Sequence, residues 1–229
     1  MQMVTNKLGR SFLVVLGVIA LVTTTHTQAA ASAESGKSVN IAPVSAPADI
    51  LDGITFAGEY TDADVTYLRN SLQLLQNQLP AWSQYIEEAK PLVLAIDLNE
   101  GEHGRLAVAQ CCGAGGSGVL RFGFHFGQSV DDAEQTPEAK QAAFLGTLTH
   151  EVTHIRDQRA GRFTTKTDRK SCVAAEKSGL EKQLEVKHAM AAENLGDAFA
   201  QALGQQIASD TRALKSRELW DRYCGAFED

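Results

Sequence analysis

Two histidines and a glutamate stand close together in the segment His150-Glu151-Val152-Thr153-His154. Residues four apart on an α-helix project from the same face, so a helix here places both imidazoles side by side. Zinc accepts neutral imidazole nitrogens at about 2.0–2.1 Å, and two histidines at this spacing can share one ion. Glu151 can reach a water on that ion and act as a general base. The pattern predicts hydrolytic metal chemistry, with His150 and His154 as ligands and Glu151 as the catalytic base.

A helix must carry this motif, and the sequence predicts one over residues 137–160. Thr136 can cap its start, Pro137 suits the first helical position, and Gly161 is a natural stop. The residues around the two histidines are largely uncharged. The simplest alternative is a helix whose two histidines take part in no chemistry.

The segment Thr147–Ile155 (TLTHEVTHI) resembles the active-site helix of the zincin metallopeptidases. Arg156 follows it, where that family usually has an apolar residue. The metzincin branch requires a glycine and a histidine at the positions that Asp157 and Ala160 occupy, so that branch is excluded. The resemblance is therefore to the gluzincin branch. It implies a Zn2+ cofactor, a peptide or protein substrate, and a third ligand that is a glutamate on a later helix.

The later helix is predicted over residues 172–195 and carries Glu176, Glu181 and Glu185. At about 100° per residue, Glu176 lies about 60° and Glu181 about 80° from the centre of its apolar stripe. Glu185 lies about 120° away on the other side and is excluded. Small zincins often have a glutamine seven residues after the ligand, as Gln183 follows Glu176. We expect Glu176 to be the third ligand and keep Glu181 as the alternative.

Other polar residues are candidates for supporting roles. Asp157 is expected beside the ligands or at the helix end rather than on the metal. The strand predicted over residues 119–126 is the candidate for the edge strand that pairs with substrate in zincins, and its His125 is a candidate substrate contact. The candidates for a transition-state donor are Tyr223, His188 and Arg162.

A small sheet is predicted ahead of the motif helix. The glycine-rich run 113–118 is followed by a strand and not by a helix, so it predicts a hairpin connection and not a phosphate-binding loop. Strands followed by helices predict an α+β fold with a small antiparallel or mixed sheet, followed by a helix-rich half that carries the metal site, and the resemblance implies that this fold is zincin-like. The predicted strands cover residues 92–98, 105–112 and 119–126, and the other helices cover 61–78, 82–89 and much of 197–227.

The N-terminus has the features of an export signal. Two cations, Lys7 and Arg10, precede an apolar run over residues 11–22, which is short for a membrane span of about 20 residues. Small residues then offer cleavage after Ala33, or nearby at residues 29–31. An uncleaved anchor is the alternative. We expect a secreted or periplasmic protein with three parts: a signal peptide over 1–33, a flexible leader over 34–50 and one zincin-like metallopeptidase domain over 51–229.

The balance of charge limits the partners. The net charge is −7, and the predicted signal peptide holds two cations and no acid, so the mature chain is more acidic still. A domain of this kind without a basic block is a poor match for nucleic acid or an anionic membrane surface. We therefore expect no nucleic acid partner, and no membrane association after signal cleavage.

The sequence has four cysteines: Cys111, Cys112, Cys172 and Cys224. An even number in an exported protein predicts two disulfides. Adjacent cysteines rarely bond to each other, so we expect Cys111 and Cys112 to reach separately to the other two, in either order. A cysteine metal site is the alternative, although no C-x-x-C spacing supports it.

Two functions of different classes follow from these patterns. The first is a secreted zinc-dependent metallopeptidase that hydrolyses peptide bonds with a zinc-activated water and Glu151 as the base. The second is a non-catalytic secreted binding protein on a zincin-like scaffold, for which Arg156 leaves room. The chain is long for a third class, the disulfide-stabilised toxin or inhibitor module.

Overall fold

The computed structural model describes residues 49–99, 106–112, 116–128, 136–163 and 168–225. The predicted signal peptide and nearly all of the predicted leader lie outside these residues. The described residues belong to one structural unit, Pro47–Asp229. No helix among them is long and apolar enough to cross a membrane.

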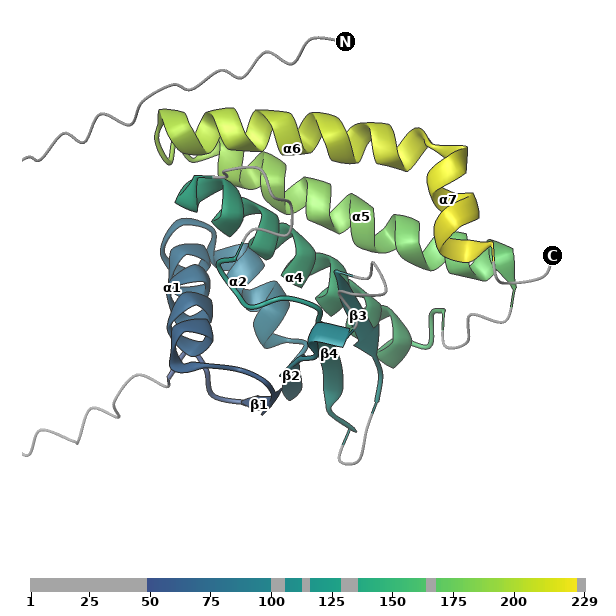
Figure 1. Cartoon of the computed structure of the whole chain (residues 1–229), viewed down its shortest axis with the longest axis horizontal. Coiled ribbons are helices and arrows are strands. Elements are labelled where there is room, and N and C mark those ends of the chain that lie inside the picture. The colour runs from purple at the N-terminus through teal and green to yellow at the C-terminus, as the bar shows by residue number, and fades with distance from the viewer. Residues whose placement is uncertain (1–48, 100–105, 113–115, 129–135, 164–167, 226–229) are drawn as a thin grey trace, which may run out of the picture. The chain divides into compact units, whose positions relative to one another are not determined.

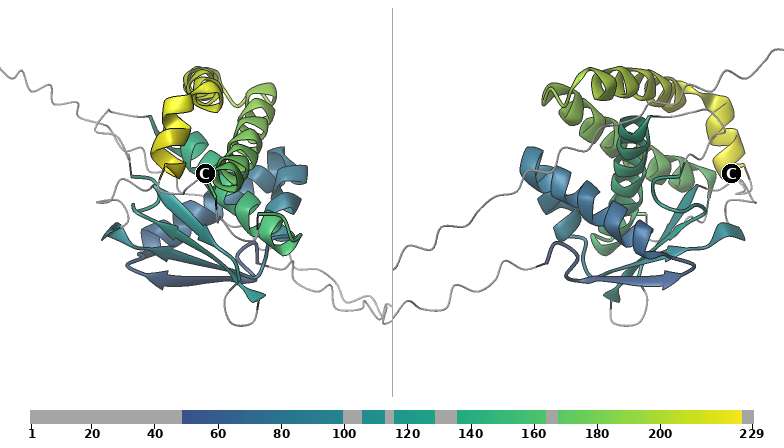
Figure 2. Two further views of the ribbon diagram at one scale, coloured as in Figure 1. Left: turned by 90° about the vertical axis from the view of Figure 1, so that its right-hand side faces the viewer. Right: turned by 60° about the vertical axis from the view of Figure 1, so that its left-hand side comes forward.

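Four strands form one mixed sheet in the order β1-β2-β4-β3. β2 pairs in parallel with β1 and with β4, while β3 is antiparallel to β4 and lies at an edge. Leu94 and Phe122 are buried on one face, and Arg121 on the other face is only partly buried, so one face carries the core. Figure 2 shows the helices gathered over that side. The strands are β1 (Ile54–Gly58), β2 (Leu92–Ile96), β3 (Ala107–Gln110) and β4 (Gly118–Phe122).

Side chains cap the start of several helices, although α5 begins at Arg169, three residues before the predicted start at residue 172, and α2 and α6 have no side-chain cap. Thr61 caps α1, Thr136 caps α4, and Asp168 caps α5 through side-chain bonds to backbone N–H groups. α4 packs on the sheet, α5 packs on α4, and α6 packs on both helices (Figure 1). The fold class is therefore α+β and mostly helical. The described helices are α1 (Asp62–Gln78), α2 (Pro80–Glu87), α4 (Pro137–Arg159), α5 (Arg169–Ala192), α6 (Asp197–Lys215) and α7 (Arg217–Cys224).

α4 is fixed against the sheet at its C-terminal half. A Cβ atom on Gly118 of β4 would lie 2.6 Å from Cγ2 of Ile155, so the bare backbone of the strand lets the helix come close. One turn later, the Arg159 guanidinium donates to the carbonyls of Ala89 at 2.5 Å, Pro91 at 3.1 Å and Gly116 at 2.8 Å. These contacts position the helix that carries the two histidines.

The strand predicted over residues 119–126 is wrong in two respects. The chain leaves the sheet after Phe122, where the carboxylate of Asp64 accepts hydrogen bonds from the backbone N–H of Phe126 at 2.6 Å and from Nδ1 of His125 at 3.0 Å. β4 also lies between β2 and β3 instead of at an edge, and β3 is the edge strand. The predicted hairpin across the glycine-rich run is confirmed, because β3 and β4 are antiparallel neighbours.

The carboxylate of Asp64 is almost fully buried, with 1% exposure, at the start of α1. Burial alone would raise its pKa. Hydrogen bonds from Thr61, His125 and Phe126 outweigh that effect and hold the pKa of Asp64 below its usual value. The charged carboxylate of Asp64 therefore links the start of α1 to the turn after β4 through hydrogen bonds.

The predicted disulfide pairing is also wrong. Cys172 in the first turn of α5 pairs with Cys224 at the end of α7, with their Cα atoms 5.8 Å apart, and Cys111 pairs with Cys112. α7 packs against α5, which brings the first pair together. Cys111 and Cys112 follow β3, where the backbone N–H of Cys111 donates to Oε1 of Gln158 at 2.9 Å. Once Cys172 and Cys224 are joined, the adjacent cysteines have only each other.

Candidate metal centre

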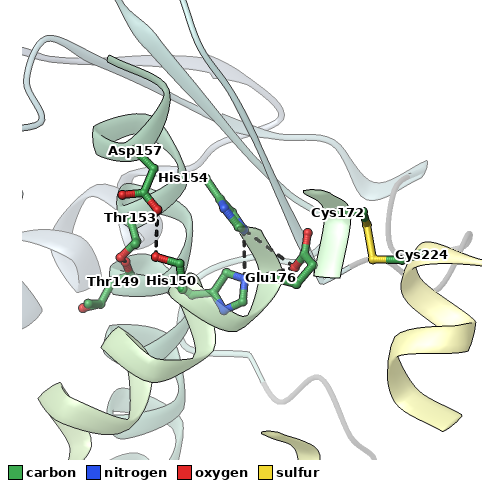
Figure 3. Close-up of polar contacts among 9 residues, drawn as sticks. Thr149, His150, Thr153, His154, Asp157, Cys172, Glu176 and Cys224 are labelled. Atoms are coloured by element: carbon green, nitrogen blue, oxygen red, sulfur yellow. Dashed lines mark hydrogen bonds and ion pairs between the residues drawn. A yellow bond between two sulfur atoms is a disulfide. The ribbon is translucent and has the colours of Figure 1, made fainter. Parts of the chain in front are cut away.

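Three side chains from two helices converge at the middle of α4. Nε2 of His150 lies 3.1 Å from Nε2 of His154 and 3.3 Å from Oε2 of Glu176, which comes from α5. Nε2 of His154 lies 3.7 Å from the same carboxylate oxygen. In Figure 3 the two rings and the carboxylate point toward a common centre.

This donor set fits one metal ion. The three ligand atoms all lie within 4.8 Å of one another. An ion about 2.1 Å from each donor in tetrahedral coordination needs the donors roughly 3.4 Å apart, close to the separations found here. Two imidazoles and one carboxylate are a combination that zinc accepts, with a fourth position left open.

Burial differs among the residues of this centre. The side chain of His154 is 5% exposed, while those of His150 and Glu176 are 16% and 18% exposed, so the centre can be reached from solvent. Glu151 is 6% exposed. No hydrogen bond to its carboxylate is found within the described ranges.

Gly179 allows α5 to approach His150 closely, a role that sequence reasoning missed. A Cβ atom on Gly179 would lie 2.7 Å from Nε2 and 2.8 Å from Cδ2 of His150. The imidazole therefore packs directly on the backbone of α5, three residues after Glu176. The available signal was a glycine inside a long helix, which costs about 1 kcal/mol relative to alanine and usually has a packing reason.

Asp157 links the two helices beside the centre. It is 2% exposed, and its Oδ2 accepts a hydrogen bond of 2.7 Å from the hydroxyl of Ser178 on α5. Its other carboxylate oxygen pairs with Arg162. Asp157 is not among the three clustered donors, in line with the supporting role expected for it.

Arg156, which departs from the zincin signature, packs on α2. Its guanidinium donates to the carbonyl of Tyr85 and to Oε2 of Glu88, both at 2.8 Å, and lies 4.1 Å from the centroid of the Tyr85 ring. The hydroxyls of Tyr85 and Thr153 are hydrogen-bonded at 3.0 Å. The departure thus serves the contact between α2 and α4.

The disulfide of α5 lies next to the centre (Figure 3). Cys172 stands four residues before Glu176, one helical turn away and on the same side of α5. Its bond to Cys224 ties α7 to the part of α5 that carries the carboxylate.

Several sequence candidates are not brought to the centre. Glu181 is exposed on α5 and lies outside the clustered donors, and Glu185 pairs with Lys182. His125 is engaged with Asp64. Of the proposed transition-state donors, Arg162 is paired with Asp157, Tyr223 is 55% exposed on α7, and His188 is exposed twelve residues beyond Glu176 on α5.

No protein-family model matches the sequence, and neither a curated protein nor a solved structure gives a match. The chemistry of the centre therefore rests on its own residues and geometry.

Proposed function

We propose that this protein is a zinc-dependent metallopeptidase of the zincin-like, gluzincin type, exported from the cytoplasm. The observation that carries the proposal is the convergence of His150 and His154 on α4 with Glu176 on α5, with all donor atoms within 4.8 Å. The nearly buried Glu151 beside this cluster supplies the second element that peptide hydrolysis needs.

Each residue has a defined part in this proposal. A zinc ion, when bound, supplies a Lewis acid and lowers the pKa of a water toward about 7. His150 and His154 would hold it through ring nitrogens, and the carboxylate of Glu176 would offset part of its charge. The carboxylate of Glu151 takes the proton of the attacking water and passes it to the nitrogen of the leaving amine.

Metal analysis of matched glutamate variants tests the ligand set. Glu176→Ala removes the carboxylate beside the histidines, while Glu181→Ala removes an exposed carboxylate from the same helix. We expect one zinc per chain in the wild type and in Glu181→Ala, and near-complete loss in Glu176→Ala. Zinc retention by Glu176→Ala, or an equal loss in both variants, would contradict the assignment.

Cleavage of a broad peptide library tests the catalytic part. Glu151→Gln should keep its zinc, because the residue is not a ligand, and should lose about 100-fold or more in rate. A wild-type protein that binds zinc and cleaves no peptide would instead be a secreted binding protein on a zincin-like scaffold.

A further inference from the structure

A positively charged hollow lies where α5, α6 and α7 meet, on a chain of net charge −7. Its volume is about 430 Å³, within the range of sites that bind small ligands or short segments. Its walls carry four cationic side chains, and Trp220 and Leu214 contribute apolar surface. The cations are Arg169 and Lys177 of α5, Lys215 at the end of α6 and Arg217 at the start of α7.

The positive charge of the hollow is only partly balanced. Arg169 and Arg217 share one carboxylate, that of Asp221, and the contact of Arg217 is a long 3.8 Å. Among the residues with described positions, no carboxylate oxygen lies within 4.0 Å of Lys177 or Lys215. Nζ of Lys177 lies 5.9 Å from the centroid of the Trp220 ring. Within the described part of the chain, the hollow therefore presents two ammonium groups without a carboxylate partner, beside an aromatic ring.

We propose that this hollow binds an acidic stretch of polypeptide. Carboxylate side chains match the ammonium groups of Lys177 and Lys215, and the partly buried Leu214 offers an apolar contact to the rest of a peptide chain. A hollow of limited volume suits side chains better than the flat surface of a membrane. The net charge of the chain is −7, so an acidic segment is attracted to a local cluster of cations such as this one and not to the molecule as a whole.

The position of the hollow relates it to the candidate metal centre. Lys177 directly follows Glu176 on α5, so the hollow and the centre occupy adjoining faces of one helix. If the proposed peptidase function holds, acidic residues of a substrate occupy the hollow while a nearby bond lies at the metal. Only this role in substrate choice rests on the proposed function, and the binding of the acidic segment does not.

Fluorescence anisotropy with a short labelled peptide tests the binding directly. The probe is a fluorescein-labelled peptide of glutamate, alanine and leucine, and its control has glutamine in place of each glutamate. The full chain carries Glu151→Gln in every measurement, so that the peptide stays intact. Lys177→Gln with Lys215→Gln removes the two free cations of the hollow. Lys170→Gln with Arg212→Gln removes two exposed cations from the same two helices outside it.

The two pairs of variants separate local binding from general attraction. We expect the acidic peptide to bind and the glutamine peptide not to bind, with affinity falling about fivefold in the hollow variant, the scale of one or two exposed ion pairs. The control pair should change affinity little, and high salt should weaken binding. Equal weakening by both pairs, or equal binding of both peptides, would overturn the proposal.

Competitors identify the occupant. Inorganic phosphate should displace the peptide no better than sodium chloride at the same ionic strength. Strong displacement by phosphate, or binding of anionic phospholipid vesicles in place of the peptide, would overturn the assignment to polypeptide. Peptide affinity should be the same with a metal chelator present, so a protein that fails to bind zinc still gives a readable result here.

Discussion

Replacing Gly179 with alanine tests whether the close approach of α5 positions the residues of the candidate metal centre. The new Cβ would lie 2.7 Å from Nε2 of His150, about 0.7 Å inside the 3.4 Å at which ordinary contact begins. Either the imidazole turns away or α5 moves back and takes Glu176 with it. Both responses exceed the roughly 0.2 Å tolerance of ligand distances, so zinc affinity should fall about 10–100-fold.

A glycine elsewhere provides the control for this variant. Gly204 lies inside α6, and a Cβ atom there would meet nothing within 4 Å. Gly204→Ala should keep wild-type zinc affinity and gain up to about 1 kcal/mol of stability from helix propensity. Gly179→Ala has the same gain in propensity, so a loss of zinc affinity without a lower melting temperature in chelator would locate the effect at the centre.

A zinc titration against a chelating dye, with circular dichroism melting in chelator, measures both quantities. If Gly179→Ala bound zinc as tightly as the wild type, the contact between His150 and α5 would have no part in metal binding, and this reasoning would be refuted.

Three further contacts, none of them made by a proposed metal ligand, can be tested by substitution. Burial lowers the pKa of Lys187, and the carboxylate of Asp210, 2.7 Å away, only partly opposes this effect. In urea unfolding, Asp210→Ala should cost about 3 kcal/mol because it leaves a buried charge unpaired, and Lys187→Met should cost under about 1 kcal/mol. Equal losses in the two variants would contradict this prediction. A carboxylate whose pKa is lower in the folded state stabilises the fold above its unfolded pKa, which is near 3.8 for Asp64. That stabilisation is lost as the pH falls through the folded pKa. Asp64→Asn should therefore be less stable than the wild type at pH 7, and its free energy of unfolding should fall less steeply as the pH is lowered. Serine at both Cys172 and Cys224 opens a loop of 52 residues and should cost about 4 kcal/mol, whereas the same change in the adjacent pair should cost far less in the same urea assay.

Local chemistry accounts for what the sequence predicted correctly. The helix with the motif begins after Thr136 and ends before Gly161, because a capping hydroxyl, a proline and a glycine act within a few residues of themselves. α1 begins after Thr61 for the same reason, with Asp64 completing a capping box. Features that depend only on near neighbours could therefore be predicted.

Contacts between distant segments account for what could not be predicted. The pairing of Cys172 with Cys224 depends on the packing of α7 against α5. Residues close to either cysteine in the sequence do not determine that packing. The alternation of phenylalanines predicted a strand beyond Phe122, yet Phe126 packs against that ring from a turn, with ring centroids 5.1 Å apart. Phe124 and Phe126 can reach the same core from a strand or from a turn, so their alternation does not distinguish the two. β1 was not predicted; none of its five residues is fully buried, whereas β2 and β4 each have three buried residues.

The first turns of α5 combine three constraints that serve one purpose. Cys172 anchors α7, Ser178 bonds to the buried Asp157 of α4, and Gly179 brings the helix against His150. All three lie within four residues of Glu176. Ser178 and Gly179 fix this part of α5 against α4, and Cys172 fixes it against α7. An ordinary helix pair tolerates shifts that side-chain rearrangement absorbs, whereas a metal ligand must be held within tenths of an ångström. Their concentration around one carboxylate therefore argues that Glu176 is held for metal binding and is not merely a surface residue beside two histidines.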